Sequence, residues 1–334
     1  MRVIGCGGAI PNATEENELI EKRFKLESGW VADRTGIKAR PKAEAKQATS
    51  DLAVAAAEAA IVAAGIDRRE LGFLVLSTST PDHPLPPSAP LVAERLGLSN
   101  PGAIDLAGAC AGFLYGLMIL SHYCDASGKP GLVIGANVLT KRLDPDDLST
   151  SVLFSDGAGC LVVEPWKPND LKGFALGSNG KFYDAIQVEV GGSRQPTSSK
   201  ALSEGRHLMK MVSGQRVFRQ GVNMMKEVAT DALNSSGMNI RDIDWLIPHQ
   251  ANQRMINETA RGLKHPVEKT ISTIEKLGNS SAATIPLALS EASSRGKISS
   301  SDMLLMTAVG AGMVSASTVL RWSGRSAGIL KVEA

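Results

Sequence analysis

The sequence predicts an α/β protein whose two similar halves stack into five layers, α/β/α/β/α. Two segments support this prediction: AVAAAEAAIVAAGIDRRELGFLVLSTST at 53–80 and MKEVATDALNSSGMNIRDIDWLIPHQAN at 225–252 match without a gap, so that Gly65 corresponds to Gly237. Each has the pattern of an amphipathic helix that ends at a glycine, a short charged turn and an apolar strand. Helices that alternate with strands favour a mainly parallel sheet covered by helices, and two such units stack into five layers.

The match continues toward the end of each half. LGLSNPGAIDLAGACAGF corresponds to ISTIEKLGNSSAATIP, where we set Gly108 against Gly278. KPGLVIGAN corresponds to SDMLLMTAVGAG, and GAGCLVVE corresponds to VSASTVLRW. We therefore expect each half to end in a pair of adjacent strands.

The domain organisation follows from this duplication. We expect a first half at 1–170, a second half at 171–323 and a tail at 324–334. The tail lies beyond the last expected strand and is predicted to be disordered. The stretch 191–205 is rich in Gly, Ser and Pro, so we predict a mobile surface loop that covers the substrate tunnel.

Composition excludes several classes of protein. The 334 residues carry a net charge of +2 and only 4% of them are aromatic, which argues against a nucleic-acid partner. The four cysteines form no CxxC pair and no zinc-site spacing, so we expect reduced thiols and no metal site. No apolar run has the length of a membrane span or the pattern of a signal peptide. These features predict a cytoplasmic protein that does not bind membranes.

Three polar side chains are placed after expected strands, where α/β proteins bind ligands. Cys110 lies among small residues in LAGACAGFLYGL, His249 follows the strand WLIP, and Asn279 lies in GNSSAATIP. The N-terminus of a helix would lower the pKa of the Cys110 thiol and make it a nucleophile. Singly, each residue also fits a structural role, as a core thiol, a hydrogen-bonding histidine or a turn asparagine. The residues left without a functional role are Cys6, Cys124, Cys160, His83, His122, His207 and His265.

Together the three residues favour carbon–carbon bond formation. Two neutral donors, Nε2–H of His249 and Nδ2–H of Asn279, can point at one developing oxyanion. The enolate left when a malonyl thioester loses CO2 is such an anion, and it can attack an acyl group on Cys110 in a Claisen condensation. The glycines of TAVGAGM at 307–313 can bring backbone N–H groups close to Cys110, as a second oxyanion hole.

Several stretches of the chain resemble the thiolase-fold condensing enzymes, specifically the β-ketoacyl-acyl-carrier-protein synthase III family. The matching stretches span almost the whole chain in the family's order: WVADRTGIKAR, DLAGACAGFLYGL, FSDGAGCLVVE, WLIPHQANQRM, LGNSSAATIP and TAVGAGM. The resemblance implies a duplicated thiolase-like fold and a homodimer that pairs through a sheet edge. It also implies acyl-CoA as substrate, acyl carrier protein as partner and no permanently bound cofactor.

The resemblance also implies roles for individual residues. Cys110 would carry the acyl group, and His249 with Asn279 would drive decarboxylation of malonyl carrier protein. The backbone N–H groups of Cys110 and Ala311 would form the acyl oxyanion hole. The remaining implied contacts are those of Trp30, Arg34, Thr35 and Asn252 with coenzyme A and its pantetheine, and those of Arg219 and Arg254 with the acidic carrier protein.

Departures from the family pattern concern the acyl group and coenzyme A. Leu148, in DPDDLST, replaces an arginine that usually sandwiches adenine with the tryptophan. Pro86, in PPSA with Ser88, replaces an aromatic residue that ends the partner's acyl pocket, and TKRLDP carries an additional basic residue, Arg142. An open pocket near an arginine suggests a longer or acidic acyl group, which Arg142 would hold by its carboxylate. Arg142 equally fits a solvated surface position.

The resulting prediction is a decarboxylating condensation of an acyl-CoA primer with malonyl carrier protein, which starts fatty-acid synthesis. The alternative is the family branch that condenses glutaryl-CoA to 3-oxopimeloyl carrier protein, a biotin precursor. A second alternative is an acyl-CoA thioesterase or an O- or N-acyltransferase on the same fold. Release of CO2 from malonyl carrier protein distinguishes condensation from hydrolysis.

Overall fold

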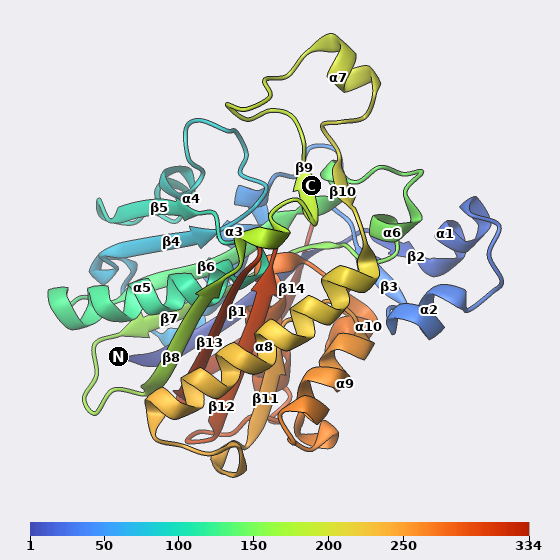
Figure 1. Cartoon of the computed structure of the whole chain (residues 1–334). Helices are drawn as coiled ribbons and strands as arrows, with labels where there is room; N and C mark the ends of the chain where they lie inside the picture. Colours follow the sequence, from blue (N-terminus) through green and yellow to red (C-terminus); the bar gives the residue numbers. More distant parts are fainter. Residues whose placement is uncertain (334) are drawn as a thin grey trace.

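Two β-sheets form the framework of the protein (Figure 1). The computed structural model describes residues 1–333. The first sheet has the strand order β14-β1-β7-β6-β4-β5 and the second has the order β11-β12-β13-β8. The strands of the first sheet are β1 (Arg2–Pro11), β4 (Phe73–Ser77), β5 (Gly102–Leu106), β6 (Gly131–Val138), β7 (Asp156–Glu164) and β14 (Arg325–Val332). Those of the second are β8 (Leu171–Ser178), β11 (Trp245–Pro248), β12 (Met303–Gly310) and β13 (Val314–Arg321).

Helices fill three layers around these sheets. α3 (Thr49–Ala64) covers the outer face of the first sheet, and α8 (Gly214–Ser236) with α9 (Gln253–Gly262) covers the second (Figure 1). α5 (Gly112–Ser127) and α11 (Thr284–Ser294) lie between the sheets and share the central core. The predicted thiolase-like, five-layer α/β/α/β/α fold is therefore confirmed.

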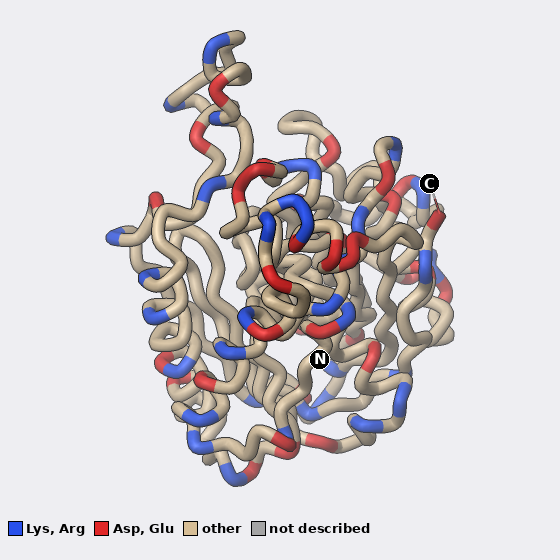
Figure 2. Tube along the Cα trace, turned by 90° about the vertical axis from the view of Figure 1, so that its right-hand side faces the viewer, with Lys and Arg blue, Asp and Glu red and all other residues tan. Residues whose placement is uncertain are grey.

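The remaining elements are short and lie near the upper edge of the sheets or at the side. They are β2 (Thr14–Glu16), α1 (Asn17–Arg23), α2 (Trp30–Thr35), β3 (Ala39–Pro41), α4 (Ala89–Arg95), α6 (Leu148–Ser151), β9 (Ile186–Val188), α7 (Ser199–Ser203), β10 (Met209–Met211) and α10 (Ile274–Leu277). Acidic and basic residues intermingle along the chain, in keeping with its small net charge (Figure 2). No helix within residues 1–333 is long and apolar enough to cross a membrane.

Close packing of α3 on the first sheet depends on small residues. A Cβ atom at Gly5 would lie 2.4 Å from the carbonyl oxygen of Ala60, and one at Gly7 would lie 2.6 Å from the Cβ of Ala59. Both glycines therefore let the alanine-rich helix approach the strand more closely than larger side chains would allow. This contact fixes the outer layer of the first half.

The duplication is visible in the element boundaries. α3 and α8 both end one residue before a left-handed glycine, Gly65 with φ 67° and Gly237 with φ 68°. Both glycines are helix C-caps, which explains why the sequence match was strong there. Each glycine is followed by a 3₁₀ turn, Arg68–Glu70 in the first half and Ile240–Asp242 in the second. The two turns are separated by the same number of residues as the two glycines, and so are the first residues of β6 and β12.

One part of the predicted match is wrong, because the two glycines were paired out of register. α5 begins at Gly112 and α11 begins at Thr284. These two residues are separated by the same number of residues as Gly65 and Gly237, so they occupy equivalent positions in the two halves. Gly108 therefore corresponds to Ser280 and not to Gly278. The glycine pair was misleading because Gly278 serves a local turn, where it adopts φ 59° and follows α10.

The prediction of a disordered tail is also wrong. Residues Arg325–Val332 form β14, which pairs in parallel with β1 at the edge of the first sheet. The carbonyl oxygen of Val332 accepts hydrogen bonds from Asn12 N–H and from the Gln47 side chain, both at 3.0 Å. The buried Gly328 and the half-buried Ile329 pack inward, so the tail is part of the fold.

The stretch 191–205 forms most of an arm that projects from the body of the protein and carries α7 (Figure 1). β9 and β10 form the base of the arm. At the arm's base, Arg206 forms an ion pair with Glu189 at 2.5 Å and also bonds Gln195. The arm is thus a defined hairpin with a short helix near its tip.

Candidate active site

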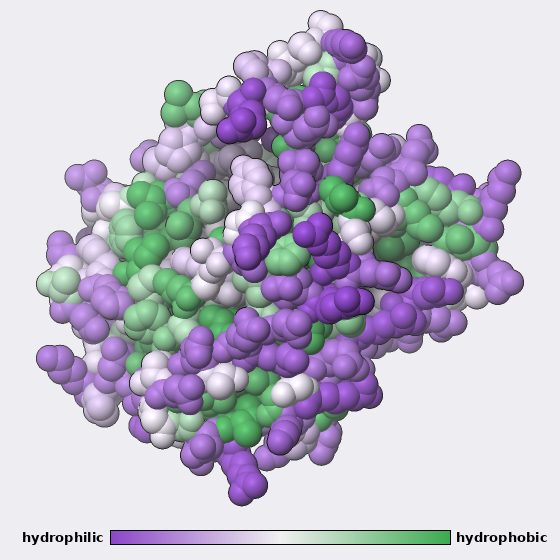
Figure 3. Space-filling model, viewed as in Figure 1, coloured by the Kyte–Doolittle hydropathy of each residue, from purple (hydrophilic) through white to green (hydrophobic). Residues whose placement is uncertain are grey.

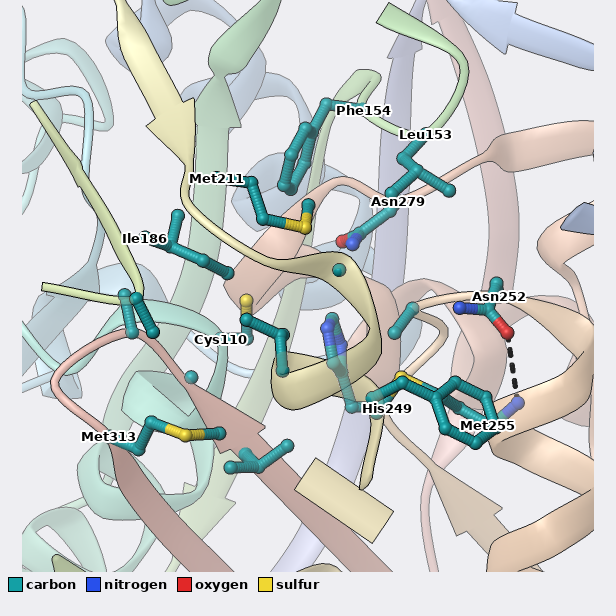
Figure 4. Close-up of a pocket in the computed structure, with 18 of the residues that line it drawn as sticks. Cys110, Leu153, Phe154, Ile186, Met211, His249, Asn252, Met255, Asn279 and Met313 are labelled. Atoms are coloured by element: carbon teal, nitrogen blue, oxygen red, sulfur yellow. Dashed lines mark hydrogen bonds between the residues drawn. The ribbon is translucent and has the colours of Figure 1, made fainter. Parts of the chain in front are cut away.

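Cys110, His249 and Asn279 line one cavity of about 310 Å³ (Figure 4). They come from distant parts of the chain, and Figure 4 shows their side chains around a common space. Most of the other lining side chains are apolar, which suits a thioester with an acyl chain. They include Leu153, Phe154, Ile186, Met211, Val217, Phe218, Met255, Val309 and Met313.

Cys110 lies in a tight turn between β5 and α5. The turn is the 3₁₀ segment Ala109–Ala111, and Ala109 adopts φ 44°, an uncommon value for a residue with a side chain. The end of β12 approaches this turn closely, because a Cβ atom at Gly310 would lie 2.6 Å from the backbone nitrogen of Cys110. The sequence therefore needs a glycine at 310. Local strain of this kind is typical of functional sites.

The thiol of Cys110 is less acidic than its place before a helix predicted. Burial raises the pKa of Cys110 to about 11, although a hydrogen bond from the Ser281 hydroxyl to Sγ, at 3.3 Å, opposes the rise. The prediction of a lowered pKa is therefore wrong, since burial has the larger effect. The thiol therefore carries its proton at neutral pH. Cys6, Cys124 and Cys160 are buried in β1, α5 and β7, as predicted for core residues.

His249 directly follows β11 and is almost fully buried. Its backbone N–H donates to the carbonyl oxygen of Thr307 at 2.8 Å, which continues the pairing of β11 with β12. Its Nδ1 lies 2.8 Å from Oγ1 of Thr284. Burial lowers the pKa of His249 to about 3, so the imidazole is neutral at neutral pH and carries one N–H. Nε2 has no hydrogen-bond partner within residues 1–333.

Asn279 is held rigidly by its neighbours. Its backbone N–H donates to Leu153 at 2.9 Å, and its backbone oxygen accepts from Ser155 at 3.0 Å. The side-chain Oδ1 accepts the backbone N–H of Ser281 at 2.9 Å. Because Oδ1 is engaged in this way, the Nδ2 amide is the end left to donate to a ligand.

Ser281 and Thr284 lie near the site and were missed by the sequence analysis. Ser281 bonds two of the three candidates directly, because its hydroxyl donates to Cys110 and its backbone N–H donates to Asn279. It reaches the third through Thr284, whose hydroxyl donates to the Ser281 carbonyl oxygen and lies 2.8 Å from Nδ1 of His249. Ser281 adopts φ 57° and corresponds to Ala109 in the first half. The signal in the sequence was weak, since small polar residues in a glycine turn are common.

Two family models match the chain. The model for 3-oxoacyl-[acyl-carrier-protein] synthase III matches residues 104–180, and the model for its C-terminal part matches residues 233–322. A 3-oxopimeloyl-[acyl-carrier-protein] synthase of Rhodothermus marinus is 46% identical over 321 residues, which cover 96% of this chain and 93% of that protein. The chain belongs to the 3-oxoacyl-[acyl-carrier-protein] synthase III family.

Further similarities support the same family. A β-ketoacyl-[acyl-carrier-protein] synthase III of Clostridioides difficile is 38% identical over 322 residues, covering 96% of this chain and 98% of that protein. The crystal structure of 3-oxoacyl-(acyl carrier protein) synthase III from Pseudomonas aeruginosa is similar with a TM-score of 0.89 and 35% identity, covering 97% of this chain and 98% of that one. The protein is therefore an acyltransferase of the ketoacyl synthase type.

The four residues that the synthase III resemblance assigns to coenzyme A lie in two places. Trp30 and Arg34 share α2, with the Arg34 guanidinium 5.1 Å from the Trp30 ring. The Thr35 hydroxyl is used within the chain, since it donates to Val31 at 2.7 Å and accepts the Ile37 N–H at 3.0 Å. Asn252 lines the cavity and caps α9 by accepting the backbone N–H of Met255, at 2.9 Å (Figure 4).

The expected docking residues for a carrier protein are exposed. Arg219 lies on α8 and Arg254 lies on α9, the two helices that cover the second sheet. Arg254 donates to the backbone oxygen of Asp33, on α2, at 3.4 Å. This bond links the α9 surface to the helix that carries Trp30.

The three acyl-pocket candidates do not line the cavity of this chain. Pro86 is exposed, while Ser88 is buried and structural, because its hydroxyl accepts the Asp82 N–H at 2.8 Å and its own N–H donates to Asp105 at 2.8 Å. Arg142 is half-buried at the end of a 3₁₀ turn (Leu139–Arg142).

The arm does not contribute to the cavity in the way that was predicted. The lining residues Ala185, Ile186 and Met211 come from its base, and no residue of 191–205 lines the cavity. The tip projects away instead of covering the tunnel (Figure 1). Residues 1–333 also contain no cluster of His, Cys, Asp or Glu suited to hold a metal ion.

Proposed function

We propose that the protein condenses an acyl-CoA primer with malonyl carrier protein, with Cys110, His249 and Asn279 as its catalytic residues. The observation that carries the proposal is one apolar cavity lined by a thiol, a neutral imidazole and a carboxamide. The neutral state of His249 matters most. A neutral donor stabilises an anion as it forms, without the cost of burying a permanent charge.

The first half-reaction loads Cys110. Its sulfur attacks the acyl carbon of acyl-CoA, the bond from that carbon to the coenzyme A sulfur breaks, and the thiol proton of Cys110 ends on coenzyme A. The charge on the carbonyl oxygen is stabilised by the backbone N–H groups of Cys110 and Ala311, both on the cavity wall. The Ser281 hydroxyl stabilises negative charge on the sulfur during attack.

The second half-reaction uses the two side-chain donors. The bond between the methylene carbon of the malonyl group and its carboxylate carbon breaks, and CO2 leaves. The electron pair of that bond forms an enolate, whose oxygen accepts hydrogen bonds from His249 and Asn279. The enolate carbon then attacks the acyl group on Cys110 and releases the sulfur, which takes a proton from water. The products are 3-oxoacyl carrier protein, coenzyme A and CO2.

A direct test follows the products. Purified protein with acetyl-CoA and malonyl carrier protein is expected to release one CO2 for each 3-oxoacyl carrier protein that mass spectrometry detects. A thioesterase would instead release free acid without malonyl carrier protein. Iodoacetamide is expected to label Cys110, and preloading with acyl-CoA is expected to block this labelling. Free acid with no CO2 would overturn the proposal.

Aromatic and basic side chains at the protein surface would bind the two large substrates, coenzyme A and the carrier protein. Trp30 and Arg34 offer an aromatic face and a cation to the coenzyme A nucleotide. Leu148 packs in the same small apolar cluster as Trp30, so one side of the expected adenine clamp is aliphatic. The exposed Arg219 and Arg254 attract the acidic carrier protein, and added salt is expected to raise its KM more than that of acyl-CoA.

A second candidate substrate is glutaryl-CoA. The Rhodothermus marinus relative bears the name 3-oxopimeloyl-[acyl-carrier-protein] synthase, which describes the product of a glutaryl primer. Arg142 is half-buried and forms no ion pair within residues 1–333, so its charge is free to meet a carboxylate. It ends the turn that begins at Leu139, and Leu139 packs with Phe154 on the cavity wall.

Competition between primers tests this candidate. Glutaryl-CoA and butyryl-CoA are compared in the wild type, Arg142→Gln and Arg142→Lys. If Arg142 holds the carboxylate, Arg142→Gln lowers kcat/KM for glutaryl-CoA by roughly tenfold or more and leaves butyryl-CoA unchanged, because a charge-assisted bond is lost. Equal loss for both primers, or preference for butyryl-CoA in the wild type, would contradict it.

We also propose that the protein is a homodimer that pairs through β5. β5 and β8 are edge strands of the two sheets and lie on the same side of the molecule (Figure 1). Apolar residues gather on this side (Figure 3). Ile104 on β5 and Leu176 on β8 are both exposed. An exposed apolar edge strand favours pairing with another strand. Light scattering is expected to give twice the mass of one chain, and Ile104→Asp is expected to give monomers.

A further inference from the structure

Glu21 is a carboxylate on α1 that is only 5% exposed. α1 and α2 lie side by side (Figure 1), and Glu21 joins them. One of its oxygens accepts the backbone N–H of Gly29 at 3.1 Å, and the other accepts that of Val31 at 3.0 Å. A buried carboxylate is costly unless it is hydrogen-bonded, so these two bonds explain why the group is tolerated at this position.

The start of α2 depends on this carboxylate. The residue before the helix, Gly29, adopts φ 87° and has no side chain with which to cap the helix. The first N–H groups of a helix have no acceptor within the helix. α2 has only six residues, so it would not be stable as a helix on its own. Its shape therefore depends on contacts from outside, and Glu21 provides two of them.

The other end of α2 places the helix beside the cavity. A Cβ atom at Gly36, the C-cap of α2, would lie 2.5 Å from the Cβ of Gln253, the first residue of α9. The residue before Gln253 is Asn252, which lines the cavity. Trp30 packs in the same small apolar cluster as Leu153, which is another lining residue. α2 is thus fixed between α1 and the cavity wall.

We propose that Glu21 is a positioning residue for coenzyme A, which caps α2 and thereby holds Trp30 and Arg34 where they meet the nucleotide. The inference rests on the proposed function, in which these two side chains contact coenzyme A. Glu21 does not line the cavity, so it acts through α2 and not on the substrate itself. Because both side chains project from one short helix, a change at its start displaces them together.

The two bonds require a carboxylate of this length. A carboxylate accepts at both oxygens, whereas an amide has one oxygen and turns an N–H donor toward the second N–H. Glu21→Gln therefore keeps the shape of the side chain and leaves one N–H of α2 unpaired. Glu21→Asp keeps the charge but is too short by one methylene group to make both bonds. Keeping the charge matters, because Glu21 is one of the carboxylates that offset the charge of the buried Arg40.

The experiment compares substrates with and without the nucleotide. Acylation of Cys110 is measured with acetyl-CoA and with acetyl-pantetheine, which lacks the nucleotide. Glu21→Gln and Glu21→Asp are each expected to lower kcat/KM for acetyl-CoA roughly tenfold, because hydrogen bonds to a charged group are lost. The value for acetyl-pantetheine is expected to stay within about twofold, since this substrate has no nucleotide for α2 to meet.

A matched control lies on the same helix. Glu18 is exposed on α1 and forms no ion pair within residues 1–333. Glu18→Gln makes the same change of charge without touching the start of α2. It is therefore expected to match the wild type with both substrates.

Calorimetry with coenzyme A separates positioning from a general loss of structure. The Kd of coenzyme A is expected to rise roughly tenfold in Glu21→Gln. The same change should add less than about twofold when Trp30→Ala and Arg34→Ala are already present, because the groups that Glu21 positions are then gone. Equal losses for acetyl-CoA and acetyl-pantetheine, an unchanged Kd, or a full tenfold rise in the alanine background would each overturn the proposal.

Failure of the proposed function would look different. A wild type that releases no CO2 from malonyl carrier protein would contradict the condensation itself, while its affinity for coenzyme A would still test the role of Glu21. If neither variant folds, hydrogen exchange in the wild type decides the question. Coenzyme A is expected to slow exchange of the Gly29 and Val31 amide protons, because a ligand that needs α2 in place stabilises it. Exchange that coenzyme A leaves unchanged would overturn the proposal.

Discussion

The two halves of the molecule share one scaffold and differ in the side chains that this scaffold presents. The turns before α5 and α11 occupy equivalent places in the two halves, and both begin with a residue of positive φ, Ala109 at 44° and Ser281 at 57°. Cys110 in the first turn and Asn279, two residues before the second turn, line the same cavity. The equivalent pairs are Ala107 and Asn279, Ala109 and Ser281, Cys110 and Ala282, Gly112 and Thr284, and Ser77 and His249.

The difference shows how a duplicated fold divides a reaction. The first half supplies the nucleophile and keeps its neighbours small, so that a thioester and the backbone of Gly310 can approach. The second half supplies polar side chains that donate hydrogen bonds. Exchanging a residue for its equivalent in the other half therefore removes one function at a time.

The largest effect is expected from Cys110→Ala. This change gives the first half the alanine that the second half has at the equivalent position, Ala282. Acyl transfer is expected to be lost completely, because no other thiol within residues 1–333 lines the cavity. Decarboxylation of malonyl carrier protein should remain measurable, since its donors are intact. Incorporation of radiolabelled acyl groups and release of CO2 are measured separately, and loss of both would contradict the division between halves.

The next largest effect is expected from Asn279→Ala. This change gives the second half the alanine that the first half has at the equivalent position, Ala107. Removing one donor from an oxyanion site lowers the rate by about 100- to 1,000-fold, and here the loss should fall on decarboxylation. Acylation of Cys110 should persist. His249→Ala is expected to behave in the same way, and a defect in acylation alone would contradict the assignment of either residue.

Ser281→Ala gives the second half the residue found at 109 and removes the hydrogen bond to Cys110. Because that bond lowers the pKa of the thiol, its loss raises the pKa above about 11 and leaves less thiolate at any given pH. Alkylation by iodoacetamide should rise about tenfold per pH unit between pH 8 and 10 in the wild type. The variant should be slower by roughly tenfold across that range, since a hydrogen bond to a charged group is lost.

The residue that directly precedes Ser281 in the chain, Ser280, provides a matched control for this experiment. Ser280 is buried and its hydroxyl has no hydrogen-bond partner within residues 1–333. Ser280→Ala should therefore alkylate at the wild-type rate. Equal slowing in both variants would show that the turn, and not the Ser281 hydroxyl, controls the thiol.

The sequence predicted the scaffold better than it predicted the polar details. Left-handed glycines, Gly65 and Gly237, and the strands after them carry a strong local signal, so the fold and its duplication were found correctly. The tail was missed because RSAGILKV is short and depends on β1 for its pairing. The raised pKa of Cys110 was missed for a related reason, because burial depends on elements that are remote in the chain.

Small polar residues were the hardest to interpret. Ser281 and Thr284 lie in GNSSAATIP, which has the composition of an ordinary turn. Their significance depends on the positive φ of Ser281 and on the approach of His249 from β11. Both are products of tertiary packing, which no local pattern encodes.

The smallest effect is expected from Ser77→Ala in the first half. Ser77 occupies the position of His249, but its hydroxyl is buried and has no hydrogen-bond partner within residues 1–333. Removing a buried, unpaired hydroxyl is expected to change the free energy of unfolding by less than about 1 kcal/mol and to leave condensation unchanged. Chemical denaturation checks this, and a marked loss of activity would mean that the first half also provides a polar group to the reaction.

The strand β14 has a consequence for how the first sheet is completed. It pairs with β1, which precedes it in the chain by both halves of the fold, so a strand made early gains its edge partner only much later. Until Arg325–Val332 has been synthesised, the edge of β1 is uncovered, and its backbone groups must wait for a partner or find another. Completion of the first sheet therefore requires synthesis to have passed through the whole second half.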